Sequence, residues 1–116
     1  MSNNINAKEW QKVTSVEEIP VLGSRVISTK AGQIAIFRNS ENAIFAVLDK
    51  CPHKGGPLSQ GIVHGLTVTC PLHSWNIDLP SGCAIAPDVG CAKSFAIKVE
   101  SGEVWLNREE IQATHG

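Results

Sequence analysis

DKCPHKGGPLSQG (residues 49–61) and CPLHSWNIDLPSG (residues 70–82) are the two stretches that decide how this chain folds. Each contains a Cys-Pro pair with a histidine two or three residues after the cysteine. The first stretch contributes Cys51 and His53, and the second contributes Cys70 and His73. Together they supply two thiolates and two imidazoles, so the sequence predicts a metal centre held between two Gly- and Pro-rich loops.

The order of these ligands favours an iron–sulfur cluster over zinc. A [2Fe-2S] cluster can hold one iron through two cysteines and the other through two histidines. We therefore predict one [2Fe-2S] cluster per chain, with Cys51, His53, Cys70 and His73 as its metal and cofactor ligands and with no catalytic residue. Two cysteines and two histidines also form an ordinary zinc set, but zinc fingers more often pair Cys with Cys and His with His. A zinc-stapled structural module is the alternative.

The ligand set has an electronic consequence. Imidazoles are neutral, so replacing two thiolates makes the cluster less negative and easier to reduce. Glycines beside the ligands let the backbone approach the inorganic sulfides, and we expect the amides of Gly55, Gly56 and Gly82 to donate to them.

Composition limits the class of protein. At 116 residues we expect a single domain, residues 1–116, whose cluster-binding subdomain spans about residues 49–91. A hydrophobic content of 42% is enough for a folded core. The net charge of −1, without a basic run, argues against a nucleic-acid partner. The N-terminus has no leader pattern, and no apolar run approaches the roughly 20 residues that span a bilayer, so we expect a cytoplasmic protein without membrane contact.

The flanking sequence predicts an all-β fold. We expect an antiparallel β-sandwich or barrel base that carries a two-loop [2Fe-2S] cluster-binding subdomain. Ser15 and Glu18 form a capping-box pattern that predicts one helical turn, and a second helical turn is expected over residues 109–114. The expected strands cover residues 10–13, 23–28, 33–38, 43–48, 66–69, 75–79, 95–99 and 103–107.

Two further cysteines, Cys83 and Cys91, follow the second loop. We expect them to be two free thiols packed beside the site. A redox-labile bridge and an extra ligand are the alternatives.

The two loops and the strand pattern around them resemble the Rieske [2Fe-2S] domain family. The resemblance implies that Cys51 and Cys70 bind one iron and that His53 and His73 bind the other. Respiratory members carry an extra cysteine in each loop, and Gly56 and Leu72 at those positions exclude that bridge. Trp75 and Ile77 stand where those members have hydroxyl donors, so we expect a potential near the low end of the range, roughly −150 mV.

Within that family, CPHKGGPLSQGIVHG (residues 51–65) and GCAKSFAIKVESGEVWL (residues 90–106) resemble the small subunit of the NAD(P)H-dependent assimilatory nitrite reductase. The resemblance implies an oxidoreductase complex of nitrate assimilation that reduces nitrite to ammonia. Its large partner subunit would carry FAD, a [4Fe-4S] cluster and sirohaem. No G-x-G-x-x-G motif is present here, so the chain would be an electron carrier without its own substrate site. The alternative is a soluble Rieske ferredoxin that delivers electrons to an aromatic-ring dioxygenase.

Overall fold

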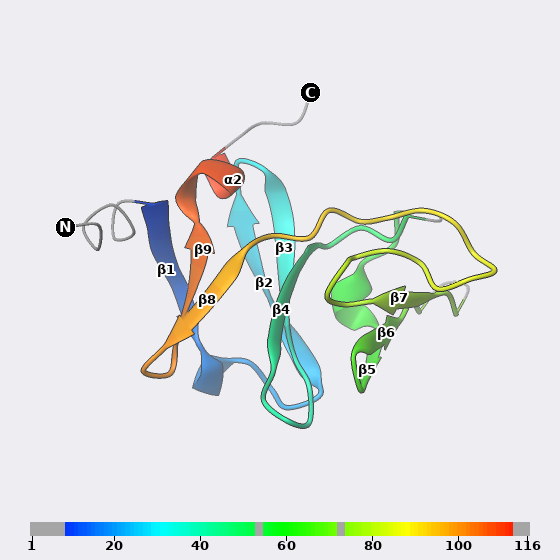
Figure 1. Cartoon of the computed structure of the whole chain (residues 1–116), viewed down its shortest axis with the longest axis horizontal. Helices are drawn as coiled ribbons and strands as arrows, with labels where there is room; N and C mark the ends of the chain where they lie inside the picture. The colour runs from blue at the N-terminus through cyan, green and yellow to red at the C-terminus, as the bar shows by residue number, and fades with distance from the viewer. Residues whose placement is uncertain (1–8, 53–54, 72–73, 113–116) are drawn as a thin grey trace.

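The computed structural model describes residues 9–52, 55–71 and 74–112, and these residues form an all-β fold, as predicted. Three antiparallel sheets of three strands each follow one another along the molecule (Figure 1). The base sheet has the order β1-β9-β8, the middle sheet β2-β3-β4 and the small sheet β5-β6-β7. The strands are β1 (Trp10–Ser15), β2 (Gly23–Thr29), β3 (Gly32–Arg38), β4 (Ile44–Leu48), β5 (Ile62–His64), β6 (Thr67–Thr69), β7 (Asn76–Asp78), β8 (Ile97–Glu100) and β9 (Glu103–Asn107).

The strands β3 and β4 of the middle sheet are buried on both faces because they are apolar at consecutive positions, whereas β2 is an exposed edge strand. In β3, Ile34 and Ile36 belong to one core while Ala35 and Phe37 belong to another. Successive residues of a strand point to opposite faces, so this run of four buried residues fills two cores at once. One core lies toward the base sheet and includes Val104 and Leu106 of β9. The other lies toward the small sheet. The middle sheet therefore lies between the base sheet and the metal-binding loops and packs against both.

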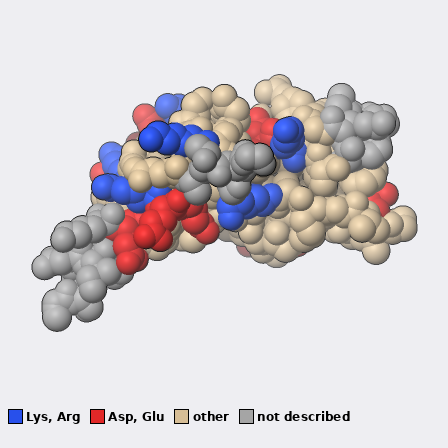
Figure 2. Space-filling model, turned by 90° about the horizontal axis from the view of Figure 1, so that it is seen from above, with Lys and Arg blue, Asp and Glu red and all other residues tan. Residues whose placement is uncertain are grey.

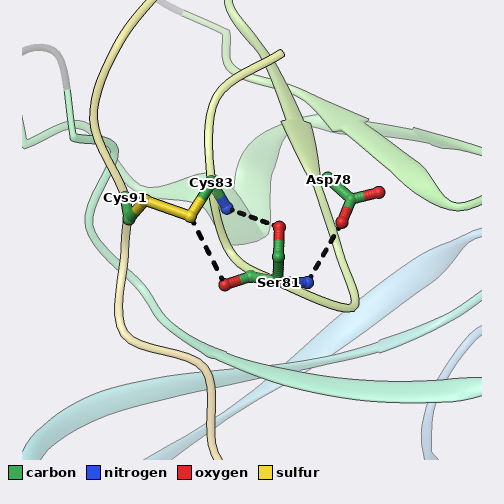
Figure 3. Close-up of a disulfide and its surroundings, with 4 residues drawn as sticks. All are labelled: Asp78, Ser81, Cys83 and Cys91. Atoms are coloured by element: carbon green, nitrogen blue, oxygen red, sulfur yellow. Dashed lines mark hydrogen bonds between the residues drawn. A yellow bond between two sulfur atoms is a disulfide. The ribbon is translucent and has the colours of Figure 1, made fainter.

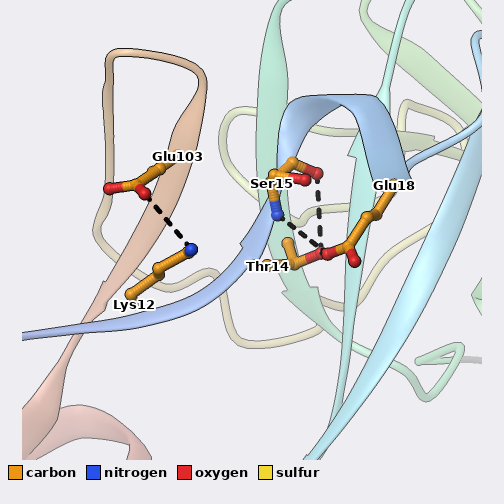
Figure 4. Close-up of polar contacts among 5 residues, drawn as sticks. All are labelled: Lys12, Thr14, Ser15, Glu18 and Glu103. Atoms are coloured by element: carbon orange, nitrogen blue, oxygen red, sulfur yellow. Dashed lines mark hydrogen bonds and ion pairs between the residues drawn. The ribbon is translucent and has the colours of Figure 1, made fainter.

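The base carries the predicted helical turn, η1 (Val16–Glu18), directly after β1. The Ser15 N–H donates to Glu18 Oε1 at 3.2 Å, which confirms the carboxylate half of the capping box. The buried Thr14 hydroxyl donates to the same oxygen at 2.8 Å (Figure 4). Figure 4 also shows the ion pair between Lys12 Nζ and Glu103 Oε2, 3.2 Å apart across β1 and β9. Both of its side chains are exposed, so it contributes at most about 1 kcal/mol.

One buried and several half-buried polar groups connect the small sheet and the first loop to the middle sheet. Asn39 is 2% exposed, and its Nδ2 donates to the Gly65 carbonyl at 3.1 Å, in the turn between β5 and β6. Asp49, directly after β4, accepts the Ser59 N–H at 2.7 Å and the Ser59 hydroxyl at 2.8 Å. The Ser24 hydroxyl of β2 donates to the Ser59 carbonyl at 3.0 Å. These hydrogen bonds set the position of the first loop relative to the middle sheet.

The structure adds two elements that the sequence did not predict, β5 and the turn η2 (Leu58–Gln60). Each is three residues long, which is too short to show a hydrophobic period. The C-terminal helical turn is α2 (Arg108–Gln112), and the last residues expected in it lie outside the described part of the chain. Within that described part, no helix is long and apolar enough to cross a membrane.

Candidate metal centre

The first loop closes on itself through the backbone of Cys51. The Cys51 N–H donates to the Gly56 carbonyl at 2.7 Å, and the Cys51 carbonyl accepts the Gly55 N–H at 2.8 Å. Gly55 has a φ of 75°, in the left-handed region that glycine tolerates at no steric cost. The result is a tight loop that turns the chain back within six residues and holds Cys51 at its start.

The second loop repeats the same hydrogen-bond pattern. The Cys70 N–H donates to the Trp75 carbonyl at 2.7 Å, and the Cys70 carbonyl accepts the Ser74 N–H at 3.0 Å. The residue four after the cysteine again has a positive φ, 60° at Ser74. The described residues of the two loops therefore share one hydrogen-bond pattern around their cysteines, so the two loops can hold one cofactor between them.

Both cysteines are buried in the same apolar cluster. Cys51 and Cys70 are each 2% exposed, and both pack in the core between the middle and small sheets. A buried thiolate is costly unless a metal or another partner compensates its charge. Two such cysteines in matched loops are the donor chemistry that an iron–sulfur cluster requires, so the described residues fit a [2Fe-2S] group. The core around them is completed by Ala35, Phe37, Val47, Leu58, Val63, Val68, Ile77, Leu79 and Ala92.

His53 and His73, the two predicted imidazole ligands, lie outside the described residues. Within residues 9–52, 55–71 and 74–112, no three His, Cys, Asp or Glu side chains come together as a possible ligand set. The described part of the predicted site therefore consists of its cysteine half, Cys51 and Cys70.

The prediction that Cys83 and Cys91 are free thiols is wrong, because the two form a disulfide (Figure 3). They lie directly opposite each other in an antiparallel bridge, with their Cα atoms 3.9 Å apart. The Ala84 N–H donates to Gly90 and the Ala92 N–H donates to Gly82, which makes the cysteines a non-hydrogen-bonded pair. Side chains approach each other most closely at such pairs. The stretch between the cysteines, CAIAPDVGC (residues 83–91), contains residues typical of turns, and this is the sequence signal that could have predicted the pairing.

The amides of Gly55 and Gly82 have a role different from the one predicted. The Gly55 N–H is used by Cys51, as described above, and the Gly82 N–H donates to the Asp78 carbonyl at 2.7 Å. Gly82 has a φ of 79°, and a Cβ atom there would overlap the Ala92 carbonyl. These two glycines thus serve backbone geometry and close packing, and their hydrogen bonds stay within the protein.

Two lysines and one carboxylate lie beside the first loop. A pocket of about 430 Å³ there is lined by Lys50, Lys93 and Asp49, with Leu48 and Gly55. The Lys50 stem runs next to Gly55, and both lysines are exposed. Seen from above, the half of the molecule that carries the small sheet shows few charged side chains, whereas acidic and basic side chains lie near one another toward the opposite end (Figure 2). The pocket beside this loop therefore combines two exposed cations with one half-buried carboxylate, Asp49.

Comparison with known proteins identifies the arrangement. The model of the family described as "Rieske [2Fe-2S] domain" matches residues 9–96. The 3-phenylpropionate/cinnamic acid dioxygenase ferredoxin subunit of Photorhabdus laumondii is 32% identical over 102 residues, covering 86% of this chain and 95% of that protein. The 4beta-methylsterol monooxygenase of Methylococcus capsulatus is 34% identical over 83 residues, or 63% of this chain, and the match spans 22% of that longer protein.

Solved structures share the fold. The ferredoxin of carbazole 1,9a-dioxygenase from Nocardioides aromaticivorans superposes with a TM-score of 0.76 at 19% identity, covering 85% of this chain and 97% of that one. A protein proposed to be a nitrite reductase NADPH small subunit gives 0.75 at 22% identity, covering 84% and 96%. At these identities the likeness is one of fold.

Proposed function

The chain belongs to the Rieske [2Fe-2S] domain family, and from that premise we propose that it is the electron-transfer small subunit of an NAD(P)H-dependent nitrite reductase. Domains of this family carry electrons through a [2Fe-2S] cluster. The nitrite reductase assignment is supported by the run CPHKGGPLSQGIVHG, which spans the first loop, η2 and β5. That run contains the first ligand loop. It also contains Ser59, whose amide and hydroxyl donate to the Asp49 carboxylate.

Within the proposal, Cys51 and Cys70 hold one iron and His53 and His73 hold the other. When bound, the cluster takes up a single electron and releases it again. The chain itself keeps the two sulfur ligands away from water, at 2% exposure each, and fixes both loops through matched backbone hydrogen bonds. Such a rigid, dry frame favours electron transfer because little has to rearrange when the charge changes.

A second candidate is a free ferredoxin that serves an aromatic-ring dioxygenase. The 32% identity to the Photorhabdus laumondii ferredoxin subunit, along 95% of its length, favours it. In either case the chain passes electrons to a larger oxidoreductase. The two candidates differ in whether that partner contains sirohaem and flavin or belongs to an oxygenase.

The deciding experiment is capture of the tagged, full-length chain from its native cell extract, followed by an absorption spectrum of the bound protein. A large partner with flavin and sirohaem bands supports the nitrite reductase assignment. NADH- or NADPH-driven nitrite loss in the extract should then fall when the chain is removed and return when it is added back. An oxygenase or a reductase without sirohaem, with nitrite loss unaffected, would overturn the assignment in favour of the ferredoxin.

A further inference from the structure

We propose that the Cys83–Cys91 disulfide is a thiol–disulfide exchange site, and that opening it releases residues 84–90 from the first ligand loop. This segment is called the bridged loop below. The inference goes beyond the proposed function and does not depend on it, because it concerns bonds within this chain alone.

The disulfide is accessible to a reductant. Cys91 is exposed and Cys83 is partly exposed, in contrast to Cys51 and Cys70 at 2% each. Exchange begins when an external thiolate attacks a disulfide sulfur, so access decides which disulfide reacts. Cys91 is the more exposed residue of the two, so its sulfur is the expected point of attack.

The bridged loop has little packing of its own. Val89 is 84% exposed and Ile85 is 42% exposed, so the two large aliphatic side chains face solvent. The backbone contacts that hold it are concentrated at its base, where Ala84 bonds to Gly90 at 2.8 Å and Ile85 bonds to Asn76 at 2.8 Å. Segments with few buried contacts open locally at low free-energy cost. The disulfide is therefore the one covalent constraint within this base, alongside the backbone hydrogen bonds there.

The bridged loop also touches the metal-binding loop. A Cβ atom built at Gly90 would lie 3.0 Å from Cβ of Pro52, the residue directly after Cys51. Gly90 has a φ of 137°, which favours glycine at this contact. Release of Gly90 would leave Pro52 without this cover, so the state of the disulfide is mechanically coupled to the first loop.

The exchange reaction needs a dithiol reductant. Its thiolate forms a mixed disulfide with Cys91 and expels the Cys83 thiolate, and its second thiol then displaces Cys91. The Cys83–Cys91 bond breaks and two cysteine thiols form, while the reductant becomes a disulfide. Two electrons and two protons move from the reductant to the protein.

The test treats the folded, full-length protein with dithiothreitol and then alkylates it, with mass analysis of the sites and amide hydrogen exchange on the same sample. We expect alkylation at Cys83 and Cys91 and at least a tenfold faster exchange of the Ala84 and Ala92 amides, with the β3 amides unchanged. The Cys83→Ser/Cys91→Ser double variant should show the faster exchange without reductant.

Two results would overturn the proposal. One is a disulfide that dithiothreitol opens only after the protein is unfolded. The other is full reduction with Ala84 and Ala92 exchange unchanged, in the wild type or in the double variant, which would make the bridge dispensable for loop closure.

Discussion

At the scale of single residues, Gly55 and Ser74 occupy the same position in the two ligand loops, but only Ser74 has a side chain. Both have a positive φ, 75° and 60°. The left-handed conformation costs a residue with a Cβ atom roughly 1–2 kcal/mol through steric overlap. Glycine has no such overlap, but it loses more chain entropy on folding, and this offsets part of the difference. Ser74 is therefore a point of backbone strain in the second loop.

We predict that Ser74→Gly raises the free energy of unfolding by up to about 1 kcal/mol, because the left-handed conformation then carries no steric cost. Chemical denaturation of the wild type and the variant measures this. Ser101→Gly is a matched control, since Ser101 has a φ of 51° in the distant β8–β9 turn. A lower stability for Ser74→Gly beside a gain for Ser101→Gly would show that the Ser74 side chain makes a contact that outweighs the strain.

At the scale of elements, the turn η1 depends on the Glu18 carboxylate. Hydrogen bonds from the Thr14 hydroxyl and then from the Ser15 amide lower the pKa of Glu18. A carboxyl whose pKa is lowered by folding stabilises the protein above its unfolded pKa. That contribution is lost as the pH falls through the lowered, folded value.

We predict that Thr14→Val raises the Glu18 pKa toward its usual range, because the largest cause of the shift is removed. An NMR titration of the Glu18 carboxyl in both proteins measures it. The stability that the Glu18 carboxylate contributes should be smaller in the variant, and its loss on acidification should be complete at a higher pH than in the wild type. An unchanged Glu18 pKa in Thr14→Val would mean that the Thr14 hydroxyl bond does not form in solution.

The elements also show what sequence can and cannot predict. The strands β3 and β4 were predicted because their apolar runs are long, and η1 because Ser15 and Glu18 have capping-box spacing. The strand β5 was missed because a glycine flanks its three residues on each side, and glycines indicate turns. The Cys83–Cys91 bridge was missed because pairing depends on the register of two extended segments, which only the folded hairpin fixes. For the site, the sequence predicts two cysteine and two histidine ligands. The structure describes the two cysteines together in one core, and the two histidines lie outside the described residues, so the ligand set stays a prediction.

At the scale of the whole molecule, charge is distributed unevenly. Lys50 and Lys93 flank the first loop, whereas Lys12 lies in the base sheet, where it pairs with Glu103. Cations around an electron-transfer site attract an acidic partner surface and raise the association rate, and salt screens this effect.

We predict that Lys93→Gln slows association with the captured redox partner severalfold at low salt and that the difference fades toward high salt. Lys12→Gln removes the same charge at the base and should leave the rate unchanged. Stopped-flow association kinetics at several ionic strengths provide the measurement. Equal effects of the two substitutions would place the docking face elsewhere.

We propose that the two matched loops hold a [2Fe-2S] cluster through Cys51, His53, Cys70 and His73. The most direct test of this proposal is the iron and acid-labile sulfide content of the purified chain, with the visible spectrum before and after reduction. We predict one cluster per chain, with visible absorbance that bleaches on reduction, and its loss in Cys51→Ser and His73→Ala. The Cys83→Ser/Cys91→Ser variant should keep the cluster. A colourless zinc-containing protein, or full iron and sulfide content in Cys51→Ser or His73→Ala, would contradict this assignment of the cluster and its ligands.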